Sequence, residues 1–413
     1  MNKILWNPNK EIMQSSSMMK LGKDFGFVKD NETLDYASLH SWSVNNLDAF
    51  WREVWKGNDV IGNFEEKAFS PNKDIRKATF FPNTNLNFAE NLLVGDDDRQ
   101  AISFHGEGRE SFSLTLKELK EKVASLAKWM KKSGVEKGDC VATLLPNCPE
   151  TIITMLASSS LGAVFTSCSP DFGIEGILDR FGQSKPKILI SCDGYGYGGK
   201  IFDIKKKTIE VRKSISSINE LVFVDYLDKN KGLDDSSWSF IIENNKTEEI
   251  IFERVPFNSP LYILYSSGTT GKPKCIVHSV GGVLLQHIKE HTYHCDFRKN
   301  DRIMYFTTCG WMMWNWMVSA LAKEVTLVIY DGSPVEPDMN ILFKITDIEK
   351  LTFLGVSAKY IDSLAKADLN PKKYFNLSNL RIIASTGSPL GPIGYDWVYS
   401  NVKEDVQLSS MSG

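Results

Sequence analysis

From Ser111 onward, short apolar runs alternate with stretches whose apolar residues recur at helical spacing. Strands that alternate with helices of about 10–15 residues are typical of parallel βαβ units. The strand-like runs are Cys140–Leu145, Val164–Ser167, Lys187–Cys192 and Leu221–Asp225 in a first series, and Leu261–Tyr265, Arg302–Phe306, Val325–Tyr330, Thr352–Val356, Leu380–Ala384 and Asp405–Ser410 in a second. This alternation predicts an α/β protein with two abutting, doubly wound subdomains.

The boundaries of the expected helices carry local signals. Thr115 is followed three residues later by Glu118, which forms a capping box, and Gly134 offers a stop at the other end of that helix. Pro149 suits the first turn of a second helix that runs to about Leu161. A third helix is expected over Ile174–Gln183.

The first 100 residues differ from the rest of the chain. They are rich in aromatic residues and in Asn and Asp, and they show no clear series of strands. Large aromatic side chains are mostly buried, so we expect residues 1–100 to form an N-terminal extension that is fixed to a main domain over residues 101–413. Asp228–Glu249 is charged and polar, which favours a linker between the two βα series.

Composition and charge exclude several classes of protein. The 413 residues are 42% hydrophobic and 24% charged, as expected of a globular protein with a large core, and the net charge is only −3. This near balance favours neither nucleic acid nor an anionic membrane as a partner. The seven cysteines include no CxxC pair, and the N-terminus lacks the apolar run of a signal peptide. Both features predict a cytoplasmic protein.

The densest chemical pattern is the nine-residue segment Ser266–Lys274, which directly follows an apolar run. It holds four hydroxyl residues, two glycines and two lysines. Glycines let backbone N–H groups approach phosphate oxygens, hydroxyls donate to these oxygens and lysines neutralise their charge. The spacing is not that of a Walker loop, because two residues separate Gly268 from Gly271 and Pro273 follows Lys272. We therefore predict a polar phosphate-binding loop of another kind.

This segment, with Tyr265 before it, resembles the nucleotide loop of the adenylate-forming superfamily, which includes acyl-CoA synthetases, adenylation domains and luciferases. The resemblance extends over about residues 110–413. It includes Leu144–Glu150 with Leu161–Ala163 and Ser169–Pro170, which are similar to the family's first βα unit, and Ser385–Leu390, which resembles its adenine-binding loop. The fold implied is the large N-terminal domain of this superfamily.

Two further segments resemble one branch of the superfamily, the acetoacetyl-CoA synthetases. Thr307–Trp316 is similar to their acyl-pocket region, and Phe81–Leu93 to their N-terminal region, which acetyl- and propionyl-CoA synthetases share in looser form. Three Trp and two Met within six residues can form a tight wall that excludes long acids. The same residues read without the resemblance suit the start of a buried helix.

The resemblance implies a role for each matching position. It places the ATP phosphates at Ser266, Ser267, Gly268, Thr269, Thr270, Gly271, Lys272 and Lys274, and it implies Thr270 and Lys274 as catalytic residues. It places adenine at Gly387, Ser388 and Pro389, and the acid at Trp311, Met312 and Trp314. It places the 3′-phosphate of coenzyme A at Lys200. Mg²⁺ is implied as the partner of ATP, with no metal site of the protein's own.

The implied reaction is the ATP-dependent ligation of acetoacetate to coenzyme A through an acyl-adenylate. Acetyl- or propionyl-CoA synthesis, and a non-catalytic nucleotide-binding protein, remain as alternatives. The family also has a Thr–acid pair after the adenine loop and a small C-terminal domain with an adenylation lysine, which this sequence, ending at Gly413, is expected to lack.

Two weaker patterns complete the sequence. His287, His291 and His294 share one helical face, with Cys295 beside them. This spacing could bind zinc, but neither a carboxylate nor a Cys pair completes the site, so a polar helix face is the favoured interpretation. The run Lys205–Lys207 is expected to be a solvated face.

Overall fold

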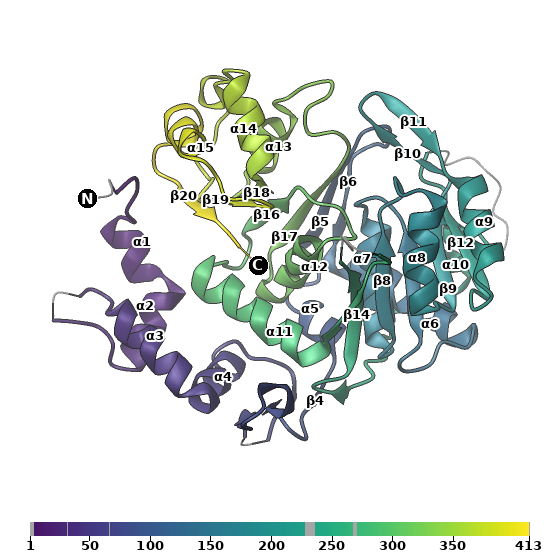
Figure 1. Ribbon diagram of the computed structural model, residues 1–413, viewed down its shortest axis with the longest axis horizontal. Helices are drawn as coiled ribbons and strands as arrows, with labels where there is room; N and C mark the ends of the chain where they lie inside the picture. Colours follow the sequence, from purple (N-terminus) through teal and green to yellow (C-terminus); the bar gives the residue numbers. More distant parts are fainter. Residues whose placement is uncertain (1–3, 31, 66, 228–235, 267–270, 413) are drawn as a thin grey trace.

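The computed structural model describes residues 4–30, 32–65, 67–227, 236–266 and 271–412. Two large sheets dominate it, and helices α7 (Pro149–Ser160) and α12 (Met312–Ser319) lie between them (Figure 1). Every residue of α7 is buried, as the layer between two sheets requires. The α/β class and the two βα units predicted from the sequence are confirmed.

The first sheet has the strand order β12-β9-β7-β8-β14-β15. Its strands are β7 (Cys140–Leu144), β8 (Val164–Cys168), β9 (Ile188–Cys192), β12 (Glu220–Val224), β14 (Pro260–Tyr265) and β15 (Cys275–Ser279). Its other helices are α6 (Leu116–Lys132), α8 (Ile174–Ser184), α9 (Lys205–Ser214) and α10 (Trp238–Asn244). All neighbouring strands are parallel except β15, which runs antiparallel to β14.

The second sheet has the strand order β20-β19-β18-β16-β17-β5-β6. Its strands are β5 (Gln100–Gly106), β6 (Phe112–Thr115), β16 (Arg302–Tyr305), β17 (Thr326–Asp331), β18 (Phe353–Ser357), β19 (Ile382–Thr386) and β20 (Gln407–Ser410). Its helices, besides α12, are α11 (Val280–Lys289), α13 (Ile341–Glu349), α14 (Ala358–Lys366) and α15 (Pro392–Trp397). Strand β5 runs parallel to β17, and β6 pairs antiparallel with β5.

The local signals in the sequence agree with these bounds. Thr115 Oγ1 accepts the Glu118 N–H at 3.2 Å, and Glu118 Oε2 accepts the Thr115 N–H at 2.7 Å, which confirms the capping box of α6. Pro149 occupies the first turn of α7, as expected. The range 228–249, interpreted as a linker, includes the short helix α10, because its Trp238 and Ile241 bury their side chains in the core.

Two antiparallel additions lie outside the strand-like runs expected from the sequence. Strand β15 follows the Ser266–Lys274 segment, and a separate hairpin, β10 (Gly194–Tyr197) with β11 (Lys200–Asp203), follows β9. Glycines and polar residues interrupt the hairpin segment, and the apolar run of β15 is only three residues long, Cys275–Val277, before His278 and Ser279. They therefore lack the continuous apolar run that marks a buried parallel strand.

The N-terminal residues form helices and short strands, of which α1 to α4 lie at one side of the molecule and α5 lies near its centre (Figure 1). The helices are α1 (Lys10–Ser15), α2 (Ser17–Asp24), α3 (Tyr36–Asn45), α4 (Leu47–Lys56) and α5 (Phe88–Leu92), and the strands are β1 (Gly62–Asn63), β2 (Phe69–Ser70), β3 (Thr79–Phe80) and β4 (Asn85–Leu86), with β13 (Val255–Pro256) added to β4. Trp55, Phe81 and Phe88 belong to the main hydrophobic core. Their burial fixes this region to the two sheets.

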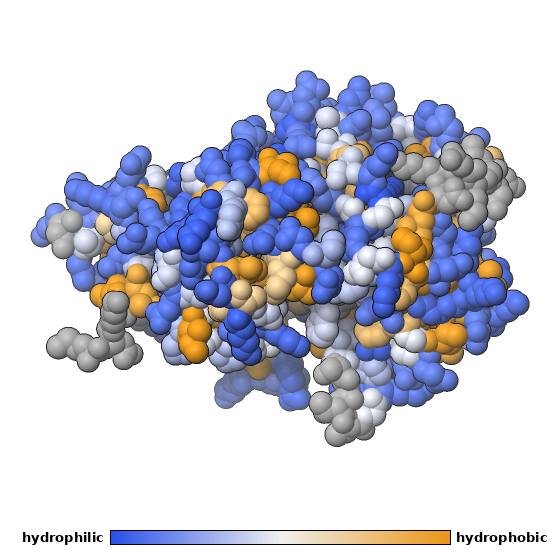
Figure 2. Space-filling model, turned by 90° about the horizontal axis from the view of Figure 1, so that it is seen from above, coloured by the Kyte–Doolittle hydropathy of each residue, from blue (hydrophilic) through white to orange (hydrophobic). Residues whose placement is uncertain are grey.

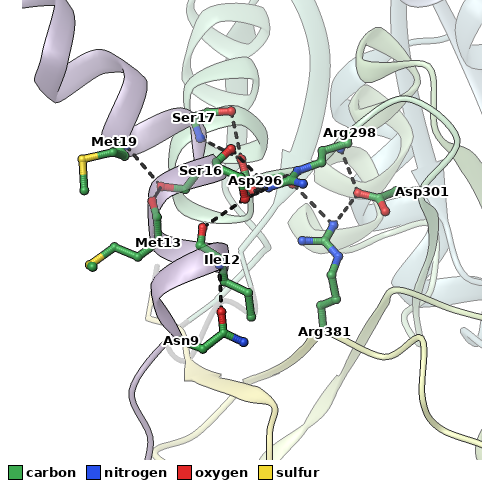
Figure 3. Close-up of polar contacts among 11 residues, drawn as sticks. Asn9, Ile12, Met13, Ser16, Ser17, Met19, Asp296, Arg298, Asp301 and Arg381 are labelled. Atoms are coloured by element: carbon green, nitrogen blue, oxygen red, sulfur yellow. Dashed lines mark hydrogen bonds and ion pairs between the residues drawn. The ribbon is translucent and has the colours of Figure 1, made fainter. Parts of the chain in front are cut away.

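The first turn of α2 is capped by a residue from far along the chain. Asp296 Oδ1 accepts both the backbone N–H and the hydroxyl of Ser17 at 2.9 Å, and its other oxygen accepts from Arg298 (Figure 3). Arg381, at the entry to β19, donates to Asp301 Oδ2 at 2.6 Å. A carboxylate at a helix N-terminus satisfies free N–H groups and faces the positive end of the helix dipole.

The surface is mainly hydrophilic, with apolar groups scattered over it, on the face that Figure 2 shows. None of the helices within the described residues has the length and apolar character needed to cross a membrane. All seven cysteines are free thiols, and only Cys275 is more than slightly exposed.

Candidate functional site

A cavity of about 520 Å³ lies where the carboxyl ends of strands from both sheets meet. The cavity is lined by residues at the carboxyl ends of β7, β8, β16 and β17, by the β10–β11 hairpin and by α9. The lining residues are Leu145, Pro146, Asn147, Ser169, Pro170, Asp171, Tyr195, Tyr197, Phe202, Asp203, Ile204, Lys207, Phe306, Thr307, Thr308, Tyr330, Asp331 and Gly332. Open α/β sheets bind ligands at their carboxyl edges, beside strands where the chain reverses direction. The fold therefore places a ligand-sized space at the expected edge.

The cavity contains a carboxyl group that holds its proton unusually tightly. Burial raises the pKa of Asp331 to about 7, against the opposing effect of the hydrogen bond that the Tyr226 hydroxyl donates to its Oδ2. Lys207 donates to the carbonyls of Pro170 and Phe172 at 2.5 and 2.9 Å, and burial lowers its pKa. The cavity lining therefore includes both a carboxyl group, neutral or charged, and an ammonium group.

The predicted phosphate loop connects β14 to the antiparallel β15. Its two ends are tied together, because the Ser266 N–H donates to the Lys274 carbonyl at 3.0 Å and the Lys274 N–H donates to Ser266 Oγ at 3.1 Å. Lys272 is exposed, with its Nζ 3.5 Å from Asp179 Oδ1 on α8. Ser267, Gly268, Thr269 and Thr270 lie outside the described residues. Both lysines are thus held at the carboxyl end of β14, where a phosphate could reach them.

The predicted adenine loop follows the carboxyl end of β19. Gly387 has a φ of +89°, and a Cβ built on it would meet no atom within 4 Å. Glycine adopts this left-handed backbone without strain, whereas a branched residue does not. Gly387, Ser388 and Pro389 are all exposed, so a flat ring can lie against their backbone.

The predicted acid-pocket residues differ in their surroundings. Trp311 is 61% exposed at the start of α12, and Met312 beside it is also exposed. Trp314 is completely buried: its indole N–H donates to Asn147 Oδ1 at 2.9 Å, and its ring stacks on Phe165. Asn147 lines the cavity, so Trp314 lies directly behind the cavity wall, while Trp311 and Met312 lie at the surface.

Lys200 is exposed at the tip of the β10–β11 hairpin, where it pairs with Tyr197. The hairpin contributes Tyr195, Tyr197 and Phe202 to the cavity. The resemblance that singled out Lys200 therefore pointed to a segment that forms part of this cavity.

Thr307 and Thr308 begin the segment that resembles the acyl-pocket region, and they line the cavity. Asp331 and Gly332 had no motif to identify them. They directly follow an expected strand, and position at the carboxyl end of a parallel strand is the one signal that could have found them. Tyr195 and Phe202 lie on the unexpected hairpin, which left no such signal.

Two of the three histidines, His287 on α11 and His291 in the segment after it, contact the same serine. His287 Nδ1 and His291 Nε2 lie 2.8 and 3.0 Å from Ser319 Oγ on α12. Burial lowers the pKa of His287 to about 3, so its ring is neutral at physiological pH. The described part of the chain contains no cluster of three or more His, Cys, Asp or Glu side chains that could hold a metal ion.

The two sheets and the cavity at their carboxyl edges define an α/β protein of the ligand-binding, doubly wound class. The chain belongs to the AMP-binding enzyme family, whose family model matches residues 92–410. These residues include both large sheets and both predicted nucleotide loops.

Individual relatives are similar over nearly the whole chain. The acetoacetyl-coenzyme A synthetase of Rhizobium meliloti (strain 1021) is 47% identical over 99% of this chain and 63% of its own length. The malonamoyl-CoA synthetase vrtB of Penicillium aethiopicum is 33% identical over 99% of this chain and 61% of its own. A solved structure of the acetoacetyl-CoA synthetase from Streptomyces lividans has a TM-score of 0.93 at 35% identity, over 100% of this chain and 65% of that one. The chain thus spans less than two thirds of each of these proteins.

Proposed function

We propose that the protein serves in the ATP-dependent activation of acetoacetate and its ligation to coenzyme A. The observation that carries this proposal is the similarity to acetoacetyl-CoA synthetases along the whole chain, at 47% identity to the relative from Rhizobium meliloti. In the proposed reaction the acid carboxylate attacks the α-phosphorus of ATP, pyrophosphate leaves, and the thiol of coenzyme A then displaces AMP from the acyl-adenylate. The low net charge and the free cysteines support the cytoplasm as the proposed location.

In this proposal the protein contributes mainly position and charge neutralisation to the first step. The β- and γ-phosphates bind to Lys272 and Lys274, together with Ser266 and Gly271. The rest of the loop is Ser267–Thr270. Gly387–Pro389 receive adenine. The support from the structure is that both segments follow the carboxyl ends of parallel strands, as ligand-binding loops of such sheets do. Mg²⁺ enters with ATP as part of the substrate, so we assign no step to a metal held by the described residues.

Coenzyme A is assigned to the cavity beside the β10–β11 hairpin. The cavity volume of about 520 Å³ lies in the range of sites for small molecules and cofactors. Its rings Tyr195 and Phe202 stack on one another at 5.2 Å and offer an aromatic surface, and Lys200 at the hairpin tip offers a cation for the 3′-phosphate.

The relative named as a malonamoyl-CoA synthetase supports a pocket for an acid with a carbonyl on its β-carbon. Malonamate and acetoacetate have this carbonyl in common, whereas acetate, propionate and butyrate lack it. Malonamate is therefore the second candidate acid. A site that hydrogen-bonds this oxygen would reject butyrate more strongly than an apolar pocket could.

Pyrophosphate exchange tests the proposal directly. We expect exchange with acetoacetate to exceed exchange with butyrate, acetate or propionate at equal concentration. Leading exchange with acetate or propionate would move the protein to the alternative branch. ATP binding in titration calorimetry without exchange for any of these acids would support the non-catalytic nucleotide-binding alternative.

A further inference from the structure

The β10–β11 hairpin stands apart from both large sheets and forms one wall of the cavity. Its strands pair only with each other in the described structure, from Gly194 opposite Asp203 to Tyr197 opposite Lys200. Tyr330 and Asp331 at the end of β17, and Gly332 in the loop after it, line the same cavity. The distance between hairpin and loop therefore determines how wide the cavity is.

One side chain bridges these two walls. Glu107 follows β5, and one of its carboxylate oxygens accepts the Gly199 N–H at the hairpin turn, while the other accepts the Ser333 N–H at 2.9 Å. Its own backbone N–H donates to the Asp331 carbonyl at 2.7 Å. The carboxylate thus joins the turn of the hairpin to the loop after β17, and its residue is anchored to that loop.

The backbone of the hairpin also lies directly against Glu107. A Cβ built on Gly196 would approach the Glu107 carbonyl oxygen to 2.1 Å, which no side chain can do without moving the hairpin. Gly196 is therefore required for this close approach. Lys200 follows Gly199 directly, so a hydrogen bond that fixes the Gly199 N–H also limits where Lys200 can lie.

We propose that Glu107 is a positioning residue: it holds the β10–β11 hairpin across the cavity and so places Lys200 and the Tyr195–Phe202 stack for the nucleotide end of coenzyme A. This inference rests on the proposed function for the identity of the ligand. Hydrogen bonds from N–H groups to a carboxylate are about twice as strong as neutral ones, which suits a single side chain to this task. Glu107 itself lies outside the residues that line the cavity and acts through the hairpin.

Hydrogen exchange tests the positioning without any ligand. We expect Glu107→Ala to accelerate amide exchange over residues 194–203, while exchange within α6 stays at the parental rate. Glu210→Gln, a change to an exposed glutamate on the neighbouring α9, is the matched control and should alter neither region. Unchanged exchange over 194–203 in Glu107→Ala would overturn the inference, whatever the ligand.

Titration calorimetry with adenosine 3′,5′-bisphosphate, the nucleotide end of coenzyme A, tests the consequence for binding. Glu107→Gln keeps the size of the side chain but turns an amide N–H₂ toward one of the two backbone N–H groups. We expect it to weaken bisphosphate binding about tenfold and to leave ATP binding unchanged. Gly196→Ala, which displaces the hairpin from the other side, should have the same selective effect.

The outcomes separate the inference from the proposed function. If the parent protein binds ATP but not the bisphosphate, the assignment of coenzyme A to this cavity is wrong, while the exchange experiment still decides the role of Glu107. If the parent binds both and Glu107→Gln binds both equally well, the positioning role is wrong. Equal loss of ATP and bisphosphate binding with a lowered melting temperature would show a general structural role and contradict the proposal.

Discussion

The guanidinium group of Arg109 forms two parallel hydrogen bonds to the carboxylate of Glu150, at 3.0 and 2.8 Å. Both side chains are about nine-tenths buried. Arg109 comes from the β5–β6 connection of the second sheet, and Glu150 from the first turn of α7, which packs in the layer between the sheets. The Arg109 guanidinium also lies over the rings of Phe104, Phe112 and Tyr226. A buried ion pair therefore links the two βα units behind the cavity.

Breaking this pair on one side should destabilise the fold strongly. Glu150→Gln leaves the Arg109 charge buried without its partner, and we expect a loss of about 3–5 kcal/mol in the free energy of unfolding. The double change Arg109→Met with Glu150→Leu should recover much of this loss, because no charge remains buried. Urea unfolding measures both values. A double variant no more stable than Glu150→Gln would contradict this account.

The same pair predicts a dependence of stability on pH. Burial alone would raise the pKa of Glu150, but the charge and hydrogen bonds of Arg109 outweigh it and hold the pKa below its usual value. This stabilisation is therefore complete above the pKa of the unfolded chain and is lost as the pH falls through the folded pKa. Glu150→Gln should reduce this loss of stability at acidic pH.

Asp331 should make the stability of the fold change with pH in the opposite direction to Glu150. Burial raises its pKa to about 7, and the Glu107 charge contributes to this rise, while Tyr226 and Arg109 oppose it. Between about pH 4 and pH 7 the folded state binds a proton that the unfolded state has lost, so stability falls as the pH rises. Asp331→Asn should match the parent near pH 4 and exceed it at pH 8, with about 4 kcal/mol as the upper limit. Parallel stability curves for parent and variant, measured by urea unfolding, would show that Asp331 does not titrate in this range.

The phosphate loop should distinguish nucleotides by their number of phosphates. Lys274→Ala, alone or with Thr270→Ala, should weaken ATP binding by about 10- to 100-fold and AMP binding much less, because AMP lacks the β- and γ-phosphates. Lys366→Ala, at an exposed lysine on α14, is the control and should change neither. Equal losses for ATP and AMP in titration calorimetry would remove the loop from the phosphate site.

Variants of Trp314 and Trp311 test the acid pocket, with the exposed Trp311 as the control for the buried Trp314. Trp314→Gly removes a buried side chain and should lower the free energy of unfolding by about 3–5 kcal/mol. A glycine within a helix should cost about 1 kcal/mol more. Trp311→Gly, at the exposed start of α12, should cost far less. If the Trp314 indole closes the acid pocket, each additional methylene of the acid should improve its use about three- to fourfold in that variant. Pyrophosphate exchange with acetoacetate, butyrate and hexanoate measures this profile. An unchanged profile in Trp314→Gly would leave the tryptophan a purely structural role.

The cap that Asp296 provides to α2 should stabilise the N-terminal helices locally. Asp296→Ala removes the acceptor of both Ser17 donors, and we expect a cost of about 0.5–2 kcal/mol, seen as faster hydrogen exchange over residues 10–24. Asp296 has a φ of +48°, which Asn tolerates well. Asp296→Asn should therefore retain more of the cap than Asp296→Ala does. Equal exchange in both variants and the parent would show that the core contacts of this region suffice to hold it.

Individual elements were predictable because their signals are local. The capping box at Thr115 and Glu118 and the Pro at the start of α7 lie within one helical turn of the boundaries that they fix. The apolar runs of the parallel strands were equally clear, since these strands are buried on both faces. The position of Ser266–Lys274 after such a run was enough to predict a loop at the ligand-binding edge.

The pairing of strands was decided by tertiary structure. Strands β5 and β6 precede the first sheet in the chain yet join the second, where β5 lies beside β17 more than 200 residues later. A strand's apolar pattern shows that it is buried but does not name its partner, because the backbone hydrogen bonds of all strands are alike. The same limit hid the hairpin β10–β11 and the antiparallel β15.

The sequence by itself determined the α/β class, the resemblance to the superfamily and the prediction of a phosphate-binding loop at Ser266–Lys274, because spacing and residue type carry these directly. Only the tertiary structure brought Glu107, Gly199 and Ser333 together, placed Trp314 behind Asn147 and paired Arg109 with Glu150. These contacts join segments 41 to 226 residues apart. They arise from the packing of two sheets with their carboxyl edges toward one another, and no local pattern specifies that arrangement.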